Sequence, residues 1–225
     1  MKTVDQKEDV MREMEKVAGP TRAFWQSRFD SGDLPWDRGQ VSPQVQRWLD
    51  EGVLRPAQRV AVPGCGSGHE VLALAQAGCD VVGIDYAQGA VDLSRARLLG
   101  AGSSAAQAAA AELVCADVLQ WQPPAPLDAV YDQTCWCALH PDRWSDWAAQ
   151  LHRWIRPGGS LCLMAMQALR DNAAEGFIEG PPYHLDVHML RALLPASHWH
   201  WPAPPYTRVD HKGGRFELAL HLQRR

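Results

Sequence analysis

Short apolar segments alternate with helical segments from residue 59 to residue 194, and this alternation most constrains the fold. The expected strands of this region are 59–63, 81–84, 112–116, 127–131 and 160–166. The expected helices are 69–76, 87–99, 143–155 and 185–194. Strands that alternate with helices of about ten residues predict right-handed βαβ units and a parallel sheet.

Two more strands are expected near the end of the chain, at 198–201 and 215–222, without a full helix between them. Because parallel neighbours need a long crossover, the short connection predicts an antiparallel pair at one edge of the sheet. The sequence therefore predicts an α/β fold with a seven-stranded, mostly parallel sheet, an antiparallel edge strand and helices on both faces.

The segment before the first strand has a different character, because it is charged and interrupted by glycine and proline. Helices are expected at 4–17 and 21–30, and a third at 43–50 is opened by the Ser42-Pro43 pair, a favourable N-cap followed by proline. We expect residues 1–40 to form an N-terminal helical lid and residues 41–225 to form the single main domain.

Composition excludes several classes of protein. The chain has 225 residues with 46% hydrophobic and 21% charged residues, which suits one globular core. The net charge is −4 and no run of lysine or arginine stands out, so we expect no nucleic-acid partner. No apolar run approaches the ~20 residues of a membrane helix, and the charged N-terminus lacks a signal-peptide core. We therefore expect a cytoplasmic monomer or homodimer without a membrane partner, and six free cysteines.

The strongest local signal is the glycine loop Gly64, Gly66 and Gly68, which follows the first strand and precedes a helix. Glycine permits a sharp turn and lets a ligand approach the backbone, and the following helix N-terminus carries partial positive charge. A purely structural turn is the alternative interpretation of such a loop.

Two acids favour a nucleoside ligand at this loop. Asp85 ends the second expected strand, where a carboxylate can accept both hydroxyls of a ribose. Asp117 ends the third, where it suits the exocyclic amine of adenine. The dinucleotide fingerprint expects a glycine where this chain has His69, so S-adenosylmethionine is favoured over NAD.

The chain resembles the class I methyltransferases, with their Rossmann-like fold, in the segments VPGCGSGH (62–69), VGID (82–85) and RPGG (156–159). More narrowly, it resembles the thiopurine S-methyltransferase-like branch, which includes thiol, thiocyanate and halide methyltransferases. The segments FWQSRF (24–29) and DLPWDR (33–38) carry that narrower likeness, which extends over nearly the whole chain.

The resemblance implies a set of residues that bind S-adenosylmethionine. Trp25 and Trp36 match cofactor-contact positions of the family, and Phe29 stands where the family has a third tryptophan. The complete expected cofactor set is Trp25, Phe29, Trp36, Gly64, Gly66, Gly68, Asp85, Tyr86, Asp117, Val118 and Asp132. The thiocyanate and halide enzymes carry a tyrosine where this chain has Ala165, which counts against those two activities.

The acceptor is expected beyond the ends of the first and fourth strands, with Asp132 and His140 as candidate catalytic groups. Gln133, Trp136 and Tyr183 are the candidate contacts of a small-molecule acceptor. Each of these residues has a plainer interpretation as a turn or packing residue.

His184 and His188 have the spacing of metal ligands on a helix, but the segment HLDVH lacks the glutamate of a metalloprotease motif, so no metal site is predicted. The leading hypothesis is S-methylation of a small thiol, because the sequence offers no obvious strong base. The alternatives are an N- or O-methyltransferase, a catalytically silent protein that binds S-adenosylmethionine, and an NAD-dependent oxidoreductase.

Overall fold

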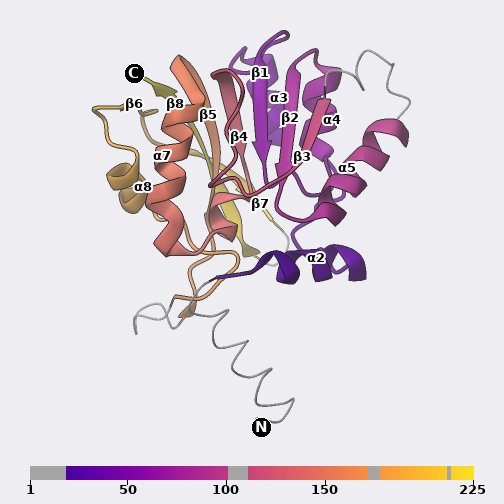
Figure 1. The fold of residues 1–225 in the computed structure, drawn as a ribbon. Coiled ribbons are helices and arrows are strands. Elements are labelled where there is room, and N and C mark those ends of the chain that lie inside the picture. Colours follow the sequence, from indigo (N-terminus) through magenta and orange to yellow (C-terminus); the bar gives the residue numbers. More distant parts are fainter. Residues whose placement is uncertain (1–18, 101–110, 172–177, 212–213) are drawn as a thin grey trace.

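The computed structural model describes residues 19–100, 111–171, 178–211 and 214–225 of the chain. The helix expected at 4–17 lies outside these residues. Within them the protein has three layers, with one twisted sheet between two layers of helices (Figure 1).

The described residues contain one eight-stranded sheet of order β3-β2-β1-β4-β5-β8-β6, with β7 pairing β8 off this path. Strands β1 to β5 run parallel to one another, whereas β8 runs antiparallel to β5, β6 and β7. The bounds are β1 Arg59–Pro63, β2 Asp80–Asp85, β3 Ala111–Cys115, β4 Leu127–Asp132, β5 Ile155–Gln167, β6 Trp199–His200, β7 Thr207–Asp210 and β8 Phe216–Arg224.

This sheet confirms the predicted α/β class and the antiparallel edge, with eight strands in place of seven. The extra strand is β7, whose four residues include a single buried side chain, Val209. Such a short, mostly exposed segment has no recognisable alternation in the sequence. β5 also starts earlier than expected, at Ile155, which pairs with Leu127 before a register shift that spans Gly158, whose φ is 75°.

The described helices are α2 Arg22–Ser31, α3 Pro43–Asp50, α4 His69–Gln76, α5 Gln88–Gly100, α7 Trp144–Trp154 and α8 Val187–Leu193. Local chemistry explains their ends: Thr21 and Ser42 accept hydrogen bonds from backbone N–H groups of α2 and α3, and Pro43 occupies the first turn of α3. None of the helices within the described ranges is both long and apolar enough to cross a membrane.

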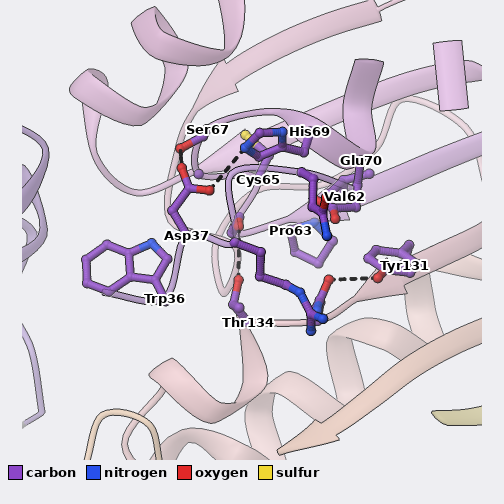
Figure 2. A pocket seen from close by; sticks show the side chains of 15 residues that line it. Trp36, Asp37, Val62, Pro63, Cys65, Ser67, His69, Glu70, Tyr131 and Thr134 are labelled. Carbon is purple, nitrogen blue, oxygen red and sulfur yellow. Dashed lines mark hydrogen bonds and ion pairs between the residues drawn. The ribbon is translucent and has the colours of Figure 1, made fainter. Parts of the chain in front are cut away.

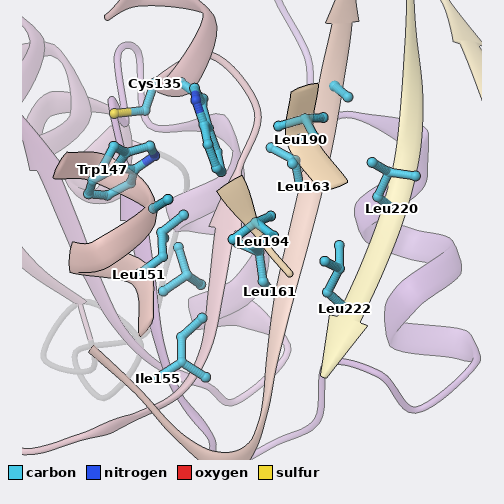
Figure 3. Close-up of a cluster of buried hydrophobic side chains, with 14 of the residues drawn as sticks. Cys135, Trp147, Leu151, Ile155, Leu161, Leu163, Leu190, Leu194, Leu220 and Leu222 are labelled. Carbon is cyan, nitrogen blue, oxygen red and sulfur yellow. The ribbon is translucent and has the colours of Figure 1, made fainter. Parts of the chain in front are cut away.

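The core has two parts, one on each face of the sheet, and alternate residues of each strand belong to different parts. On β4, Ala129 and Tyr131 pack with α3 and α4, whereas Val130 packs with α7 and α8. Figure 3 shows the second part, where Trp147 and Leu151 of α7 meet leucines of β5, α8 and β8. This alternation decides which side chains at the strand ends face which layer.

Helix α2 lies across the edge of the sheet at which the parallel strands end (Figure 1). It packs closely on the start of α5: the backbone N–H of Gly89 donates to Gln26 Oε1 at 3.2 Å, and a Cβ added at Gly89 would lie 2.7 Å from Phe29 Cβ. The N-terminal segment therefore covers the edge where open α/β sheets bind ligands.

Candidate active site

The glycine loop turns the chain from β1 into α4 through left-handed backbone positions. Gly64 and Gly68 have φ angles of 60° and 75°. A Cβ at Gly68 would lie 2.6–2.9 Å from three atoms of Ser94, so only glycine fits this turn. A Cβ at Gly66 would instead meet nothing nearer than 3.9 Å, so there is space on the Cα side of this residue, while its C=O accepts from Ser94 Oγ at 2.9 Å.

Asp85 ends β2 beside this loop, as expected, and is buried. Its carboxylate accepts hydrogen bonds from the backbone N–H groups of Gly66 at 2.9 Å and Ala87 at 3.0 Å. Burial raises the pKa of Asp85, while these hydrogen bonds oppose that rise. Because each oxygen has two lone pairs, the carboxylate can accept ribose hydroxyls in addition.

The other expected cofactor residues on this side lie close to Asp85. Tyr86 follows it directly, and the guanidinium of Arg22 on α2 lies 4.7 Å from the centre of its ring. Asp117 lies two residues beyond β3 and accepts from the N–H of Leu119 at 2.9 Å, and Val118 is buried beside it. The loop, Asp85 and Asp117 thus converge at one strand edge.

The three expected aromatic residues of the N-terminal segment form one cluster. The rings of Trp25 and Trp36 are 5.4 Å apart and those of Phe29 and Trp36 are 6.0 Å apart, both edge to face. Their side chains are only partly buried, and ring faces of this kind attract cations. Together with the space at Gly66, the cluster fits S-adenosylmethionine, whose sulfur carries a positive charge.

Residues 33–40, which we call the strap, connect α2 to α3 and are held against the glycine loop by Asp37. The Asp37 carboxylate accepts from Ser67 Oγ, lies 3.0 Å from His69 Nε2 and accepts from the N–H of Gly39. Burial raises the pKa of Asp37, but these hydrogen bonds and the charge of His69 outweigh it, so the net pKa is lowered. Burial and the nearby Arg97 lower the pKa of His69.

Beneath the strap lies a hollow of about 520 Å³, its open mouth included. Figure 2 shows side chains of the strap, the glycine loop, α4 and β4 converging on it, including Tyr131, which donates to Gln133 Oε1 at 2.8 Å. Its lining residues are Trp36, Asp37, Arg38, Gln40, Val62, Pro63, Gly64, Cys65, Gly66, Ser67, His69, Glu70, Tyr131, Gln133 and Thr134.

Of the expected acceptor residues, Gln133 lines this hollow and the others do not. Asp132 and Trp136 are fully buried. The Asp132 side chain points to the opposite face of the sheet from Tyr131, which lines the hollow. The Asp132 carboxylate accepts from the N–H of Trp136 at 3.1 Å and from Trp147 Nε1 at 2.8 Å. Burial raises its pKa to about 6, against the effect of these bonds. The placement favours a role in fixing the loop after β4.

His140 and Tyr183 lie together at a different place, outside the hollow's lining. Their rings are 5.7 Å apart, edge to face, and the N–H of Tyr183 donates to Cys137 O at 2.7 Å. A Cβ at Gly19 would lie 2.6 Å from His140 Cβ, so the start of the described chain packs on this histidine. His140 thus borders the N-terminal segment, and Tyr183 packs against His140.

The segment from His184 to His188 has a structural explanation. Asp186 is the N-cap of α8 and accepts from the N–H groups of His188 and Met189. His184 Nδ1 accepts from the N–H of Ala168 at 3.2 Å. The two histidines therefore sit on either side of a helix start.

Sequence reasoning did not single out Asp37, Arg38, Ser67, Glu70 and Tyr131 as site residues. The first two stand in the DLPWDR segment noticed for its tryptophan. Alternation along β4 separates Tyr131 from Asp132, but no sequence pattern indicates which of the two faces the hollow.

Comparison with known proteins agrees with this geometry. The family model of thiopurine S-methyltransferase matches residues 20–212. The chain is 31% identical to thiocyanate methyltransferase 1 of Arabidopsis thaliana over 170 residues, covering 76% of this chain and 70% of that protein. It is 27% identical to a thiopurine S-methyltransferase of Pseudomonas putida over 181 residues, 76% and 82% of the two chains.

Solved structures share the fold. A 1,6-didemethyltoxoflavin-N1-methyltransferase of Burkholderia thailandensis, determined with S-adenosylhomocysteine, superposes with a TM-score of 0.68 at 17% identity over 100% of this chain and 91% of that one. A magnesium protoporphyrin IX methyltransferase of Synechocystis superposes with a TM-score of 0.67 at 17% identity over 89% and 98% of the two chains. The fold, the site and the family match together show that this chain is an S-adenosylmethionine-dependent methyltransferase of the thiopurine S-methyltransferase family.

Proposed function

We propose that the protein methylates the sulfur of a small thiol, which binds in the hollow beneath the strap. The proposal rests on the hydrogen bonds that already occupy the two carboxyl groups lining this hollow. Asp37 is engaged by Ser67 and His69, and Glu70 Oε1 accepts from the backbone N–H of Ser42 at 2.9 Å. Among the described lining residues, these are the two carboxylates, and neither is a free base. A thiol needs the least help, since part of it is ionised near neutral pH.

The chain's own residues position the two reactants. Gly64, Gly66 and Asp85 would hold the adenosine and amino-acid parts of S-adenosylmethionine, and the rings of Trp25 and Trp36 would face its positive charge. The cofactor supplies an already activated methyl group. Alignment and exclusion of water can then supply roughly 7–11 kcal/mol of the barrier.

We further propose that the N-terminal segment, residues 1–40, acts as a lid. Its described part already covers the strand edge through α2 and the strap. Deleting residues up to Pro35 should leave a core that binds S-adenosylhomocysteine weakly and turns over little, because Trp25 and Phe29 are lost. Normal turnover by the truncated protein would contradict the lid.

The function is tested by incubating the protein and S-adenosylmethionine with thiols, amines and phenols and measuring release of S-adenosylhomocysteine. We expect turnover with thiols and little with amines or phenols. Methylation of an amine or phenol alone would replace the proposal by N- or O-transfer. Binding of S-adenosylmethionine without any turnover would indicate a silent binding protein.

Roles for the remaining expected residues follow from their positions. Gln133 is proposed to contact the acceptor, and His140 with Tyr183 to close the far side of the lid. If His140 takes a proton, His140→Ala should lower turnover of a high-pKa acceptor by about 10²–10⁴-fold and affect a low-pKa thiol much less. Equal losses for both acceptors would contradict that role.

A further inference from the structure

Arg38 brings a cation to the hollow beneath the strap. Its Nη2 donates to the backbone oxygen of Asp210 at 3.3 Å, and its Nη1 lies 3.1 Å from His211 Nε2. Both contacts are with the end of β7, so the guanidinium is held between the strap and the C-terminal strands. Arg38 also lines the hollow, together with Gln133 and Tyr131.

The neighbours of Arg38 leave some of its N–H groups unused. His211 Nε2 lies 2.7 Å from Glu217 Oε2, a carboxylate with no exposed surface. Glu217 Oε2 and Arg38 Nη1 thus both approach the same ring nitrogen of His211. A guanidinium carries five N–H groups, and within the described residues Arg38 contacts Asp210 O and His211 Nε2 alone, so some of its N–H groups remain for another acceptor.

Other polar groups at this end of the hollow are already paired with one another. Tyr131 donates to Gln133 Oε1, and Gln133 Nε2 donates to Glu217 Oε2 at 3.0 Å. These bonds fix the amide of Gln133 at the Glu217 carboxylate, which also contacts His211. In the described part of the chain, Arg38 forms no ion pair with a carboxylate.

The remaining titratable groups of the lining are buried or bonded to groups other than Arg38. On α4, burial raises the pKa of Glu70, whose Oε1 accepts from the N–H of Ser42 at 2.9 Å, and burial lowers the pKa of His69. On the strap, Asp37 is bound to Ser67 and His69. In the loop, burial raises the pKa of the Cys65 thiol, which stays protonated.

We propose that Arg38 is the specificity-determining residue of the acceptor site and binds the acceptor sulfur as a thiolate, with Glu217 and His211 holding the guanidinium in place. This inference rests on the proposed S-methylation. The thiol releases its proton to solvent before transfer. The sulfur then forms a bond to the methyl carbon as the bond from that carbon to the sulfonium sulfur breaks, which yields a thioether and S-adenosylhomocysteine.

The first test is the pH dependence of kcat/KM for 2-mercaptoethanol, a thiol that is largely protonated at neutral pH. A guanidinium near the sulfur should move the rising limb about 1–3 pH units below the pKa of the free thiol. Arg38→Gln should return the limb to that pKa and lower kcat/KM at neutral pH by roughly 10–1000-fold, and Arg38→Lys should lie between. An unchanged limb in Arg38→Gln would overturn the proposal.

The second test needs no turnover and uses calorimetry of the complex with S-adenosylhomocysteine. Thiophenolate, which is ionised at neutral pH, should bind the wild type at least 10-fold more tightly than Arg38→Gln. Thioanisole, its neutral methylated counterpart, should bind both equally. Equal binding of thiophenolate by both proteins would overturn the proposal, as would an equal loss for thioanisole.

Arg95→Gln is the matched control, because Arg95 is an exposed arginine of α5 that pairs with Asp92. It should leave both the pH profile and thiophenolate binding unchanged, and a shift as large as that of Arg38→Gln would overturn the assignment. The two tests separate this inference from the proposed function. If Arg38 governs thiophenolate binding but no thiol is methylated, the function fails and the anion site stands.

Discussion

Removing the Asp37 carboxylate should release the strap while leaving the rest of the fold intact. The side chain is 19% exposed and joins the strap to Ser67 and His69. Hydrogen bonds to a charged group contribute about 1.5–3 kcal/mol each. Because water replaces part of this at a partly exposed site, we take about 2–3 kcal/mol for the pair lost in Asp37→Ala.

Hydrogen exchange followed by mass spectrometry measures this loss directly. The amide of Asp37 donates to Leu34 O at 2.9 Å, so the strap has exchange protection to lose. At 1.4 kcal/mol per tenfold, exchange of residues 33–40 should accelerate roughly 25–150-fold. Peptides from β1 and β4 should exchange as in the wild type.

Asp33→Ala is the control for this experiment, since Asp33 lies in the same strap and pairs with Arg28. Its side chain is 58% exposed, and such surface pairs contribute about 0–1 kcal/mol. Exchange of the strap should therefore change by less than about fivefold. Equal acceleration in both variants, or none in Asp37→Ala, would refute the inference that the hydrogen bonds of Asp37 hold the strap against the glycine loop.

Three other predictions concern the loop and the buried acids. Asp85→Ala should weaken S-adenosylhomocysteine binding by about 100-fold or more in calorimetry, because a charge-assisted pair of hydrogen bonds is lost; an unchanged dissociation constant would contradict the ribose role. Gly68→Ala should lower the unfolding free energy, measured by urea titration, by about 2 kcal/mol or more, because the added Cβ would clash with Ser94. Gly32→Ala is the control, because Gly32 has a φ of 70° but open space around it, and it should lower the unfolding free energy by only about 1 kcal/mol. Equal losses in the two variants would argue against the clash with Ser94. Burial raises the pKa of Asp132 to about 6 in the folded protein, so the protonated carboxyl stabilises the fold below pH ~4, and about 3 kcal/mol of that stability is lost as the pH rises through 6. The unfolding free energy that Asp132→Asn loses relative to the wild type should therefore be smaller at pH 7.5 than at pH 4.5. A loss that is the same at both pH values would contradict the raised pKa.

Much of the fold follows from short-range sequence patterns. The alternation of apolar runs and helices predicted the parallel strands, and Ser42-Pro43 predicted the start of α3. The position of Asp85 at the end of β2 was also predictable, because carboxyl ends of parallel strands meet at one edge. These features depend on neighbours within a few residues, so the sequence carries them directly.

The orientation of side chains at the strand ends depended on the tertiary structure. Asp132 and Gln133 are adjacent in sequence, yet one lies in the core beside α7 and the other lines the hollow. Neighbouring residues of a strand point to opposite faces of the sheet, so alternation predicts that the two side chains lie on different sides. Packing across the whole sheet decided which helices cover each face, and therefore which side chain reaches the hollow.

The strap and its partners were equally beyond local patterns. Asp37 meets residues about thirty positions away, and Arg38 meets His211 and Asp210 more than 170 positions away. The sequence by itself predicted a nucleoside-binding edge with aromatic residues of the N-terminal segment in front of it. The tertiary structure alone decided which charged groups close the acceptor hollow, because contacts between distant segments form only when the sheet brings their ends together.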